Sequence, residues 1–326
     1  MKEKVLRLLI EADDFLSGED ISKSLGVSRT AIWKHINKLK QEGYLIEAVT
    51  NKGYKISLQN DILNGVELAS LIKETGLIRD VLVYEQIDST NKEAKRKGME
   101  GRGNLLIISE EQLSGSGRRG KGWVSAKNTG IYMTMLLKPD LTPSQGAMLT
   151  LIAGIAVLRA IKKHTDMDCK IKWPNDIVLN NKKICGILTE MSSEIDFINY
   201  LVIGIGINVN QSSMEEDIKK IGTSLRLEGG QEYSRKQLII QVIEEFTPLY
   251  NKYLEDKSLD FIIEEYNRDC INIGKIVKIE ENKNIYLGKA LMVNNEGELI
   301  VELEDKTIKT ISSGEVSVRG LYGYVE

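Results

Sequence analysis

A glycine-rich, cationic segment is the part of the sequence whose residue types point most directly to chemistry. Residues 114–123 read Ser-Gly-Ser-Gly-Arg-Arg-Gly-Lys-Gly-Trp and lie between two predicted strands. Glycine lets backbone N–H groups approach an anion, and arginine adds charge-assisted hydrogen bonds to phosphate or carboxylate. A solvated basic hairpin is the alternative, but it gives the four glycines no purpose. The segment therefore favours an anion-binding loop that is mobile when empty.

Three further segments could contribute to the same site. Residues 172–176 (KWPND) alone indicate a packed turn, because Trp and Pro usually pack and Asn and Asp cap turns. In residues 183–188 (KICGIL), Lys183 enters a buried strand, either as the exposed end of a hairpin or aimed at an anionic ligand. Residues 204–210 (GIGINVN) put two glycines on one face of a strand, which indicates a bulge or a closely approaching ligand.

The cysteines and the apolar runs exclude several classes of protein. Cys169, Cys185 and Cys270 form no CxxC pair, so neither a disulfide framework nor a cysteine zinc site is expected, and no metal held by the protein alone is predicted. A reducing compartment fits this cysteine usage. The longest apolar run, residues 147–158, is shorter than the roughly 20 residues that cross a bilayer. The charged N-terminus lacks a signal-peptide core. We expect a cytoplasmic protein without a membrane partner.

The first 62 residues predict a winged helix-turn-helix domain. Apolar spacing indicates helices at 4–12, at 21–25 and from Ser28 to about Glu42, with Ser17 and Ser28 as caps. Strands are predicted at Leu45–Val49 and Tyr54–Leu58 around a turn at 50–53. Three helices followed by a hairpin are typical of DNA-binding winged helices.

Residues 60–66 read as a linker, and residues 67–270 alternate helical and strand signals, which predicts one mixed α/β domain. Residues 271–326 carry short alternating strands, which predict a small β-barrel. The predicted strands are 81–86, 105–110, 131–137, 169–173, 177–179, 183–191, 200–209, 275–280, 286–293, 299–303, 307–312 and 316–319, and the predicted central helices are 145–164, 235–254 and 259–270.

The distribution of charge supports DNA binding by the first domain. The whole chain has a net charge of −3, which excludes a uniformly basic nucleic-acid binder. Residues 1–20 carry three basic and six acidic side chains, whereas residues 21–55 carry seven basic and two acidic ones. A protein-interaction module is the alternative for the domain, and packing is the alternative for Trp33. The DNA-binding candidates are Ser28, Arg29, Thr30, Trp33, Lys34, Asn37, Lys38 and Lys52.

Taken in order, residues 87–91 (IDSTN), the Gly/Arg loop, KWPND, KICGIL and GIGINVN resemble the biotin protein ligase family over essentially the whole chain. The two flanking domains resemble those of its bifunctional members, which also repress the biotin operon. The resemblance implies an α+β multidomain fold. It comprises the N-terminal winged helix-turn-helix (1–62), a central mixed α/β, class II synthetase-like ligase domain (67–270) and a C-terminal SH3-like β-barrel (271–326).

The resemblance also implies an activity. Such enzymes make biotinyl-5′-AMP from biotin and ATP with Mg²⁺, and then transfer biotin to a lysine of the biotin carboxyl carrier domain of acetyl-CoA carboxylase. The same adenylate is the co-repressor, and the adenylate-bound homodimer binds operator DNA. Two anions meet when the biotin carboxylate attacks the α-phosphate, so cations rather than a general base are required. This fits a chain whose only histidines are His35 and His164.

Carried over position by position, the resemblance implies roles for the site residues. Lys183 and Arg118 are the expected catalytic residues. The expected biotin-binding residues are Ser89, Thr90, Asn91, Gln112, Gly115, Ser116, Gly117, Arg118, Lys183, Gly186 and Gly204. The expected ATP- and adenylate-binding residues are Arg118, Arg119, Trp123, Asn175, Asp176, Lys183 and Asn208. Ser116 departs from the Gly-Arg-Gly-Arg-Arg-Gly pattern of the family loop, where the first Arg would stand, so weaker retention of the ligand is expected.

Two other functions share parts of this pattern. A ligand-sensing repressor without catalysis would also carry a winged helix, but it would not need Arg118 and Lys183 around a mobile glycine loop. A lipoate-type ligase has a related catalytic domain, but the DNA-binding domain and KWPND argue against it.

Overall fold

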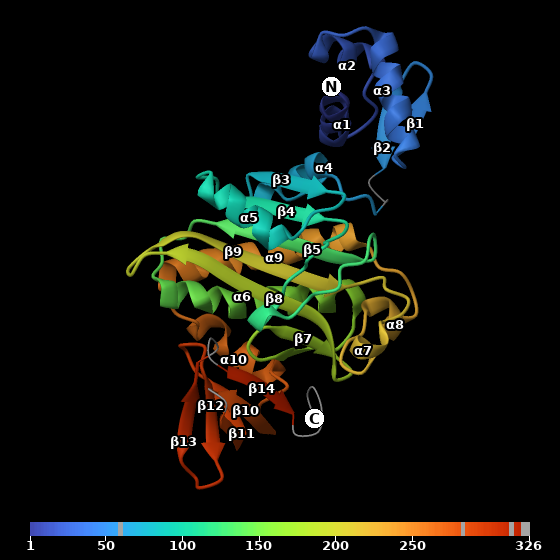
Figure 1. Ribbon diagram of the computed structural model, residues 1–326. Coiled ribbons are helices and arrows are strands. Elements are labelled where there is room, and N and C mark those ends of the chain that lie inside the picture. Colours follow the sequence, from blue (N-terminus) through green and yellow to red (C-terminus); the bar gives the residue numbers. More distant parts are fainter. Residues whose placement is uncertain (58–60, 282–283, 313–315, 321–326) are drawn as a thin grey trace.

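The described residues, 1–57, 61–281, 284–312 and 316–320, form three sheets in the computed structural model (Figure 1). A two-stranded sheet belongs to the N-terminal part, a seven-stranded mixed sheet to the centre and a five-stranded antiparallel sheet to the C-terminal part. The predicted fold class is thereby confirmed. The predicted strand end Leu58, the first linker residue Asn60 and parts of the tail at 282–283, 313–315 and 321–326 lie outside the described residues.

The N-terminal part is a winged helix with a core of its own (blue in Figure 1). Its elements are α1 (Lys2–Glu11), α2 (Gly18–Leu25), α3 (Arg29–Gln41), β1 (Leu45–Val49) and β2 (Gly53–Ser57). Ser17 and Ser28 cap α2 and α3 by accepting backbone N–H groups, as the sequence predicts. Gly26 ends α2 at φ 64°, a left-handed conformation that glycine adopts without strain. The tight turn into α3 follows from these two local signals.

The central sheet has the strand order β3-β4-β5-β9-β8-β7-β6. Its strands are β3 (Asp80–Tyr84), β4 (Leu105–Ser109), β5 (Gly130–Leu137), β6 (Lys170–Lys172), β7 (Asp176–Leu179), β8 (Lys182–Ser193) and β9 (Ile198–Asn208). The pairing of β3 with β4 is parallel, and the remaining pairings in this sheet are antiparallel. All seven strands lie within one or two residues of predicted ones.

The two faces of this sheet are covered differently. Helices α6 (Pro143–Thr165) and α9 (Arg235–Asp256) pack on one face, where alternate residues of β9 such as Ile203, Ile205 and Ile207 join the main core. Helix α5 (Thr90–Met99) packs on the other face, over Tyr200 and Val202. The part of that second face farther along β8 and β9 is left for loops.

Helix α6 is long and apolar enough to be considered as a membrane span by length and composition alone. However, 67% of its most apolar window is buried within the protein, and it packs against both the sheet and α9. Helix α6 is therefore the core helix of the central part.

Several short elements were not predicted from the sequence. Part of the predicted linker is the start of α4 (Gly65–Leu71), which Asn64 caps by accepting the N–H groups of Val66 and Glu67. Helix α5 was also missed, because Ala94 is its one buried aliphatic side chain and a helical stripe is absent. The others are η1 (Lys73–Thr75), η2 (Arg118–Gly120), α7 (Glu216–Lys219) and α8 (Leu225–Gly229).

The C-terminal sheet has the order β13-β12-β11-β10-β14. Its strands are β10 (Ile276–Glu281), β11 (Asn284–Val293), β12 (Leu299–Leu303), β13 (Ile308–Ile311) and β14 (Val316–Gly320), and α10 (Asp260–Asp269) precedes them. Buried residues of this sheet belong to the same core cluster as the central helices. The tail is therefore packed onto the central part rather than suspended from it.

Trp173 forms a polar link between these two parts. Its buried indole Nε1 donates to the Gly297 carbonyl at 3.1 Å, and its backbone N–H donates to Asn272 Oδ1 at 2.8 Å. Both contacts hold the start of the turn at residues 173–176, so the C-terminal part positions that turn.

We predict that Asn272→Ala lowers the free energy of unfolding by about 1–3 kcal/mol, because the buried Trp173 N–H then loses its acceptor. Urea denaturation measures this. The control is Asn295→Ala, which removes an exposed hydrogen bond to Asp260 and should have little effect. Equal losses in the two variants would contradict the link.

Candidate functional site

The site lies on the sheet face that the long helices leave uncovered, and the alternation of β9 creates it. The residues that follow Tyr200 and Val202 on this face are Gly204 and Gly206, while the isoleucines between them point into the core. Gly186 of β8 pairs with Gly206 and adds a third position without a side chain. These glycines hollow out the sheet surface beside the Gly/Arg loop.

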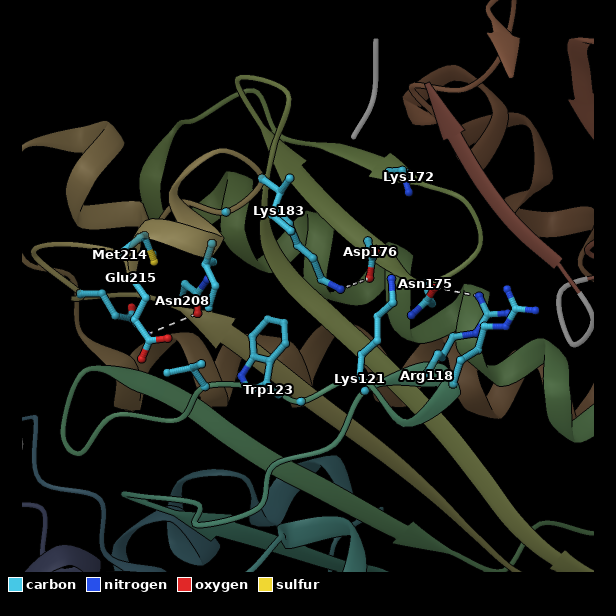
Figure 2. Close-up of a pocket in the computed structure, with 18 of the residues that line it drawn as sticks. Arg118, Lys121, Trp123, Lys172, Asn175, Asp176, Lys183, Asn208, Met214 and Glu215 are labelled. Carbon is cyan, nitrogen blue, oxygen red and sulfur yellow. Dashed lines mark hydrogen bonds and ion pairs between the residues drawn. The ribbon is translucent and has the colours of Figure 1, made fainter. Parts of the chain in front are cut away.

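Two connected compartments occupy this region. The larger has a volume of about 730 Å³ and the smaller about 50 Å³. Five residues line both compartments and form the junction between them: Gly117, Arg118, Trp123, Asn175 and Lys183. Figure 2 shows Trp123, Lys183, Asn175 and Arg118 around the larger compartment.

Trp123 closes the smaller compartment. A Cβ atom on Gly206 would lie 2.6 Å from the indole Cε2, and one on Gly186 would lie 3.1 Å from Cζ3, so the ring rests on the glycines of β8 and β9. The Lys183 ammonium stands 5.3 Å from the ring centroid, within cation–π range. The small volume therefore reflects a tryptophan held in place by residues of the site itself.

A hydrogen-bond network lines the inner end of the smaller compartment. Gln112 Oε1 accepts from the backbone N–H and the hydroxyl of Thr90, at 2.9 and 3.1 Å. Gln112 Nε2 donates to Ser125 Oγ at 2.9 Å. The buried Thr134 hydroxyl lies 2.8 Å from Thr90 Oγ1 and 2.7 Å from Asn91 Oδ1. This network fixes polar groups against which a ligand with both donors and acceptors can be oriented.

Asn91 has a supporting position in this network. Its Nδ2 donates to Glu190 Oε2 at 2.9 Å and to the Leu188 carbonyl at 3.3 Å. A Cβ atom on Gly204 would lie 2.0 Å from Asn91 Oδ1, so glycine is required there for α5 to approach β9. The polar atoms of Asn91 thus bond to the protein itself.

The junction carries the charges of the site. Lys183 Nζ forms an ion pair with Asp176 at 2.6 Å. Arg118 Nη1 donates to Asn175 Oδ1 at 3.0 Å, and Asn175 Nδ2 donates to the Ile187 carbonyl at 2.9 Å. Burial lowers the pKa of the Arg118 guanidinium, and the charge of Asp176 opposes this shift. The two cations therefore converge on the point where the compartments meet.

The larger compartment is predominantly cationic. Its charged lining residues are Arg118, Arg119, Lys121, Lys172, Lys183, Asp176 and Glu215. Because five cations face two carboxylates, a ligand with several negative charges, such as a polyphosphate, suits this compartment. The buried Trp123 Nε1 has no hydrogen-bond acceptor among the described residues.

The structure brings most of the candidate ligand-binding residues together. The smaller compartment is lined by Ser89, Thr90, Asn91, Gln112, Ser116, Gly117, Arg118, Lys183, Gly186 and Gly204. The larger one is lined by all seven adenylate candidates: Arg118, Arg119, Trp123, Asn175, Asp176, Lys183 and Asn208. Gly115 differs, because it lies outside both linings and is buried against the Trp123 carbonyl, Gln112 and Ser125.

Several lining residues were not among the candidates. Lys172 belongs to KWPND but received no ligand role, and Lys121 belongs to the Gly/Arg loop. The segment at 211–222 contributes Met214, Ile218 and Ile221, whose apolar spacing across a short helix could have indicated a covering element. Asn208 meets this segment through its Oδ1, which accepts from Gln211 Nε2, and its Nδ2 donates to the Thr223 carbonyl.

The DNA-binding candidates lie on α3, at its N-cap and in the turn of the wing. Arg29, Thr30, Trp33, Lys34 and Lys38 are exposed on α3, and Asn37 is half-buried. Trp33 is 55% exposed and is therefore outside the core. Ser28 Oγ is occupied as the cap of α3. Lys52, in the turn of the wing, is exposed and lies over the Phe15 ring. No cluster of three His, Cys, Asp or Glu side chains that could hold a metal occurs in the described part of the chain.

Three family models match the chain. The Biotin/lipoate A/B protein ligase family matches residues 83–208, the HTH domain matches residues 2–55 and the Biotin protein ligase C terminal domain matches residues 273–319. The three matches follow the same order as the three sheets of the fold.

Individual proteins resemble nearly the whole chain. The bifunctional ligase/repressor BirA of Bacillus spizizenii is 34% identical over 327 residues and covers 98% of both chains. The bifunctional ligase/repressor BirA of Escherichia coli is 29% identical and covers 97% of this chain and 96% of its own. Among solved structures, biotin protein ligase from Aquifex aeolicus in complex with biotin and ATP has a TM-score of 0.65 at 29% identity, covering 74% of this chain and 98% of that chain.

We predict that Gly206→Ala displaces Trp123, because the added Cβ would lie 2.6 Å from the indole. In a Trp33→Phe background, acrylamide quenching of tryptophan fluorescence should increase, and stability should fall by about 1–3 kcal/mol. The control is Gly122→Ala in the Gly/Arg loop that carries Trp123, where an added Cβ meets no atom within 4 Å. If the two variants are quenched equally, the glycine surface does not hold the ring.

Proposed function

Because the chain belongs to the biotin/lipoate A/B protein ligase family, with the domain composition of its bifunctional ligase/repressor members, we propose that it is a biotin protein ligase and a biotin-responsive repressor. It forms biotinyl-5′-AMP from biotin and ATP, and transfers biotin to a lysine of the biotin carboxyl carrier domain of acetyl-CoA carboxylase. Residues 1–62, 67–270 and 271–326 are its proposed domains, and the cytoplasm is its proposed location.

The junction of the two compartments is the observation that carries this proposal. In our assignment, the smaller compartment takes biotin, with the ureido ring at Thr90 and Gln112, and the larger takes ATP. The biotin carboxylate then meets the α-phosphate between Lys183 and Arg118. The smaller compartment opens when the Trp123 indole moves away from Gly186 and Gly206. In our assignment, the moved indole then lies against the adenine.

Adenylation follows from this placement. An oxygen of the carboxylate attacks the α-phosphate, the bond to the β-phosphate breaks, and pyrophosphate leaves with the electron pair. A carboxylate is already ionised at pH 7, so no general base is needed. Lys183 and Arg118 offset the repulsion between the anions and stabilise the charge that develops in the transition state. The lysine amine of the carrier then attacks the anhydride carbonyl, and AMP leaves.

Mg²⁺ fits the donor set of the larger compartment. Carboxylate and phosphate oxygens are the ligands that this ion prefers, and the Asp176 carboxylate lines the compartment. Asp176 together with the ATP phosphates would hold the ion, which supplies additional positive charge against the phosphates. The Lys183–Asp176 ion pair keeps that carboxylate in place.

The Gly/Arg loop serves as a cover for the adenylate. A mixed anhydride hydrolyses in water, so a loop that orders around it protects the intermediate. Ser116 Oγ donates to the Ser114 carbonyl at 3.3 Å and carries no charge. The cationic character of the loop therefore depends on Arg118, Arg119 and Lys121, and we expect weaker retention of the adenylate than a further arginine would give.

Repression uses the exposed side of α3 and the wing on operator DNA. A single winged helix makes few phosphate contacts, so high affinity requires two of them on a palindrome. Biotinyl-AMP orders the ligand loops in advance and lowers the entropic cost of joining two copies through the central domain. The adenylate thereby acts as co-repressor. A lipoate ligase or a non-catalytic sensor would fail the biotin-dependent exchange test that follows.

We predict that Lys183→Met lowers biotin-dependent ATP–pyrophosphate exchange by about 10²–10³-fold, the range found when one electrostatic group is removed from an active site. Lys182→Met is the matched control and should retain exchange, since Lys182 lies outside both linings. Lipoate should not support exchange in the wild type. Normal exchange by Lys183→Met would contradict the assignment of Lys183.

We predict that biotinyl-AMP strengthens dimerisation, and by linkage that dimerisation strengthens adenylate binding by the same factor. Sedimentation with and without biotinyl-AMP measures the dimerisation constant, and titration onto operator DNA measures the affinity of the protein for the operator. If the adenylate changes neither constant, the chain is a ligase with a passive DNA-binding domain.

A further inference from the structure

A completely buried ion pair lies between the winged helix and α9. Lys236 Nζ is 2.5 Å from Glu67 Oε1, and the two side chains are 1% and 0% exposed. Glu67 lies in α4, directly after the segment that leaves the winged helix, and Lys236 lies in the first turn of α9. Desolvating two charges costs several kcal/mol per ion, so such a pair contributes orientation rather than stability.

The winged helix reaches this pair through Tyr44. Tyr44 belongs to the core of the winged helix and is 3% exposed. Its hydroxyl and Glu67 Oε2 are both buried, without a hydrogen bond of normal geometry among the described residues. Burial, and then the neighbouring Glu67 carboxylate, raise the pKa of Tyr44, so its O–H stays protonated beside that carboxylate. Helix α1 also packs against α4.

A second polar contact fixes the segment that enters the central part. Asp61 Oδ2 accepts from Arg235 Nε at 2.8 Å, and Asp61 Oδ1 accepts from the Lys236 backbone N–H at 3.0 Å and the Ser234 hydroxyl at 3.1 Å. Arg235 also binds Glu110 at 2.5 Å, at the end of β4. The Arg235 side chain is 6% exposed. Asp61 therefore caps α9 from a distant part of the chain.

The Glu67–Lys236 and Asp61–Arg235 contacts both lie at the first turn of α9. Together they resist rotation of the winged helix relative to the ligase domain. Ile62 adds an apolar contact, since it packs against the winged-helix core. A DNA-binding domain on a free tether would search a wide range of orientations. Here the recognition helix α3 is held in one orientation relative to the ligase domain, at the top of the molecule in Figure 1.

We propose that Tyr44–Glu67–Lys236 and Asp61–Arg235–Glu110 form an anchor that fixes the winged helix on the ligase domain and thereby determines which half-site spacing the operator must have. This inference rests on the proposed repressor function. In a dimer joined through the central domains, the distance between the two recognition helices is then set by the protein. The spacing between the two half-sites follows that distance, because the DNA presents the same groove to the protein once per helical turn of about 10 base pairs.

The first experiment tests the rigid docking without DNA. A fluorescent probe is attached to Glu47→Cys, an exposed position on β1, and labelling is selective because Cys169, Cys185 and Cys270 are buried. Time-resolved anisotropy of the full chain should show one slow correlation time, that of the whole molecule. The double variant Asp61→Ala/Arg235→Ala should add a faster component. Glu67→Gln removes the carboxylate charge with little change in side-chain size and leaves the buried Lys236 ammonium without its counter-charge, so it should add the faster component too.

The second experiment tests the spacing. The wild type with biotinyl-AMP selects duplexes from a random-sequence pool, and the spacer of a selected duplex is changed by one base pair. Wild-type affinity should fall by about tenfold, comparable to the cost of a mismatched base pair. The double variant should fall by less than about threefold. The matched control is Lys252→Ala/Asp256→Ala, which removes an exposed ion pair on α9 and should behave as the wild type.

The outcomes separate the inference from the function on which it rests. A fast component in the wild type, or identical anisotropy and spacing dependence in wild type and double variant, would overturn the anchor. Biotin-dependent exchange should be unchanged in all variants, which shows that the ligase domain is folded. If the wild type with biotinyl-AMP selects no duplex, the repressor function and its spacing rule are wrong, and the anisotropy alone decides the rigid docking.

Discussion

The alternation of residues along β9 is the constraint on which the rest of the structure depends. In one strand, every second residue from Leu201 to Ile207 is apolar and faces the long helices, while the residues between them end in two glycines that face the loops. The strand thus holds the core and hollows the ligand site at the same time. A shift of one residue in register would put isoleucines into the site and glycines into the core.

The charged residues of the site depend on that hollow. Lys183, Asp176 and Arg118 come from β8, β7 and the Gly/Arg loop, and they meet only because the glycines let Trp123 and the loop lie on the sheet. The turn that carries Asn175 is held by Asn272 and Gly297 of the C-terminal part through Trp173. The proposed adenylation site is therefore supported by the central and C-terminal parts jointly.

The first turn of α9 has a comparable role at the other end of the molecule. Three consecutive side chains, Ser234, Arg235 and Lys236, bind residues that follow the winged helix in the sequence. The contacts are polar, and the Lys236–Glu67 pair is completely buried, so this pair depends on geometry more strongly than an apolar contact would. If the proposed ligase and repressor functions are correct, this contact connects the DNA-binding part to the part that makes the co-repressor.

The sequence by itself determined the elements whose signals are local. Caps at Ser17 and Ser28, the period-two pattern of the strands and the ordered glycine motifs predicted the three-part fold and all five residues at the junction of the two compartments. Helix α5 was missed because tertiary packing, rather than an apolar stripe, makes it helical. Likewise, no local sequence pattern indicates a role for Thr134 or Glu190 in the site. Gly115 belongs to a glycine-rich segment that predicts a mobile loop, but it is buried against the Trp123 carbonyl, Gln112 and Ser125. Only the tertiary structure decided these positions, because each depends on a partner far away in the sequence. A local sequence pattern does not show which distant residue will lie beside a given position.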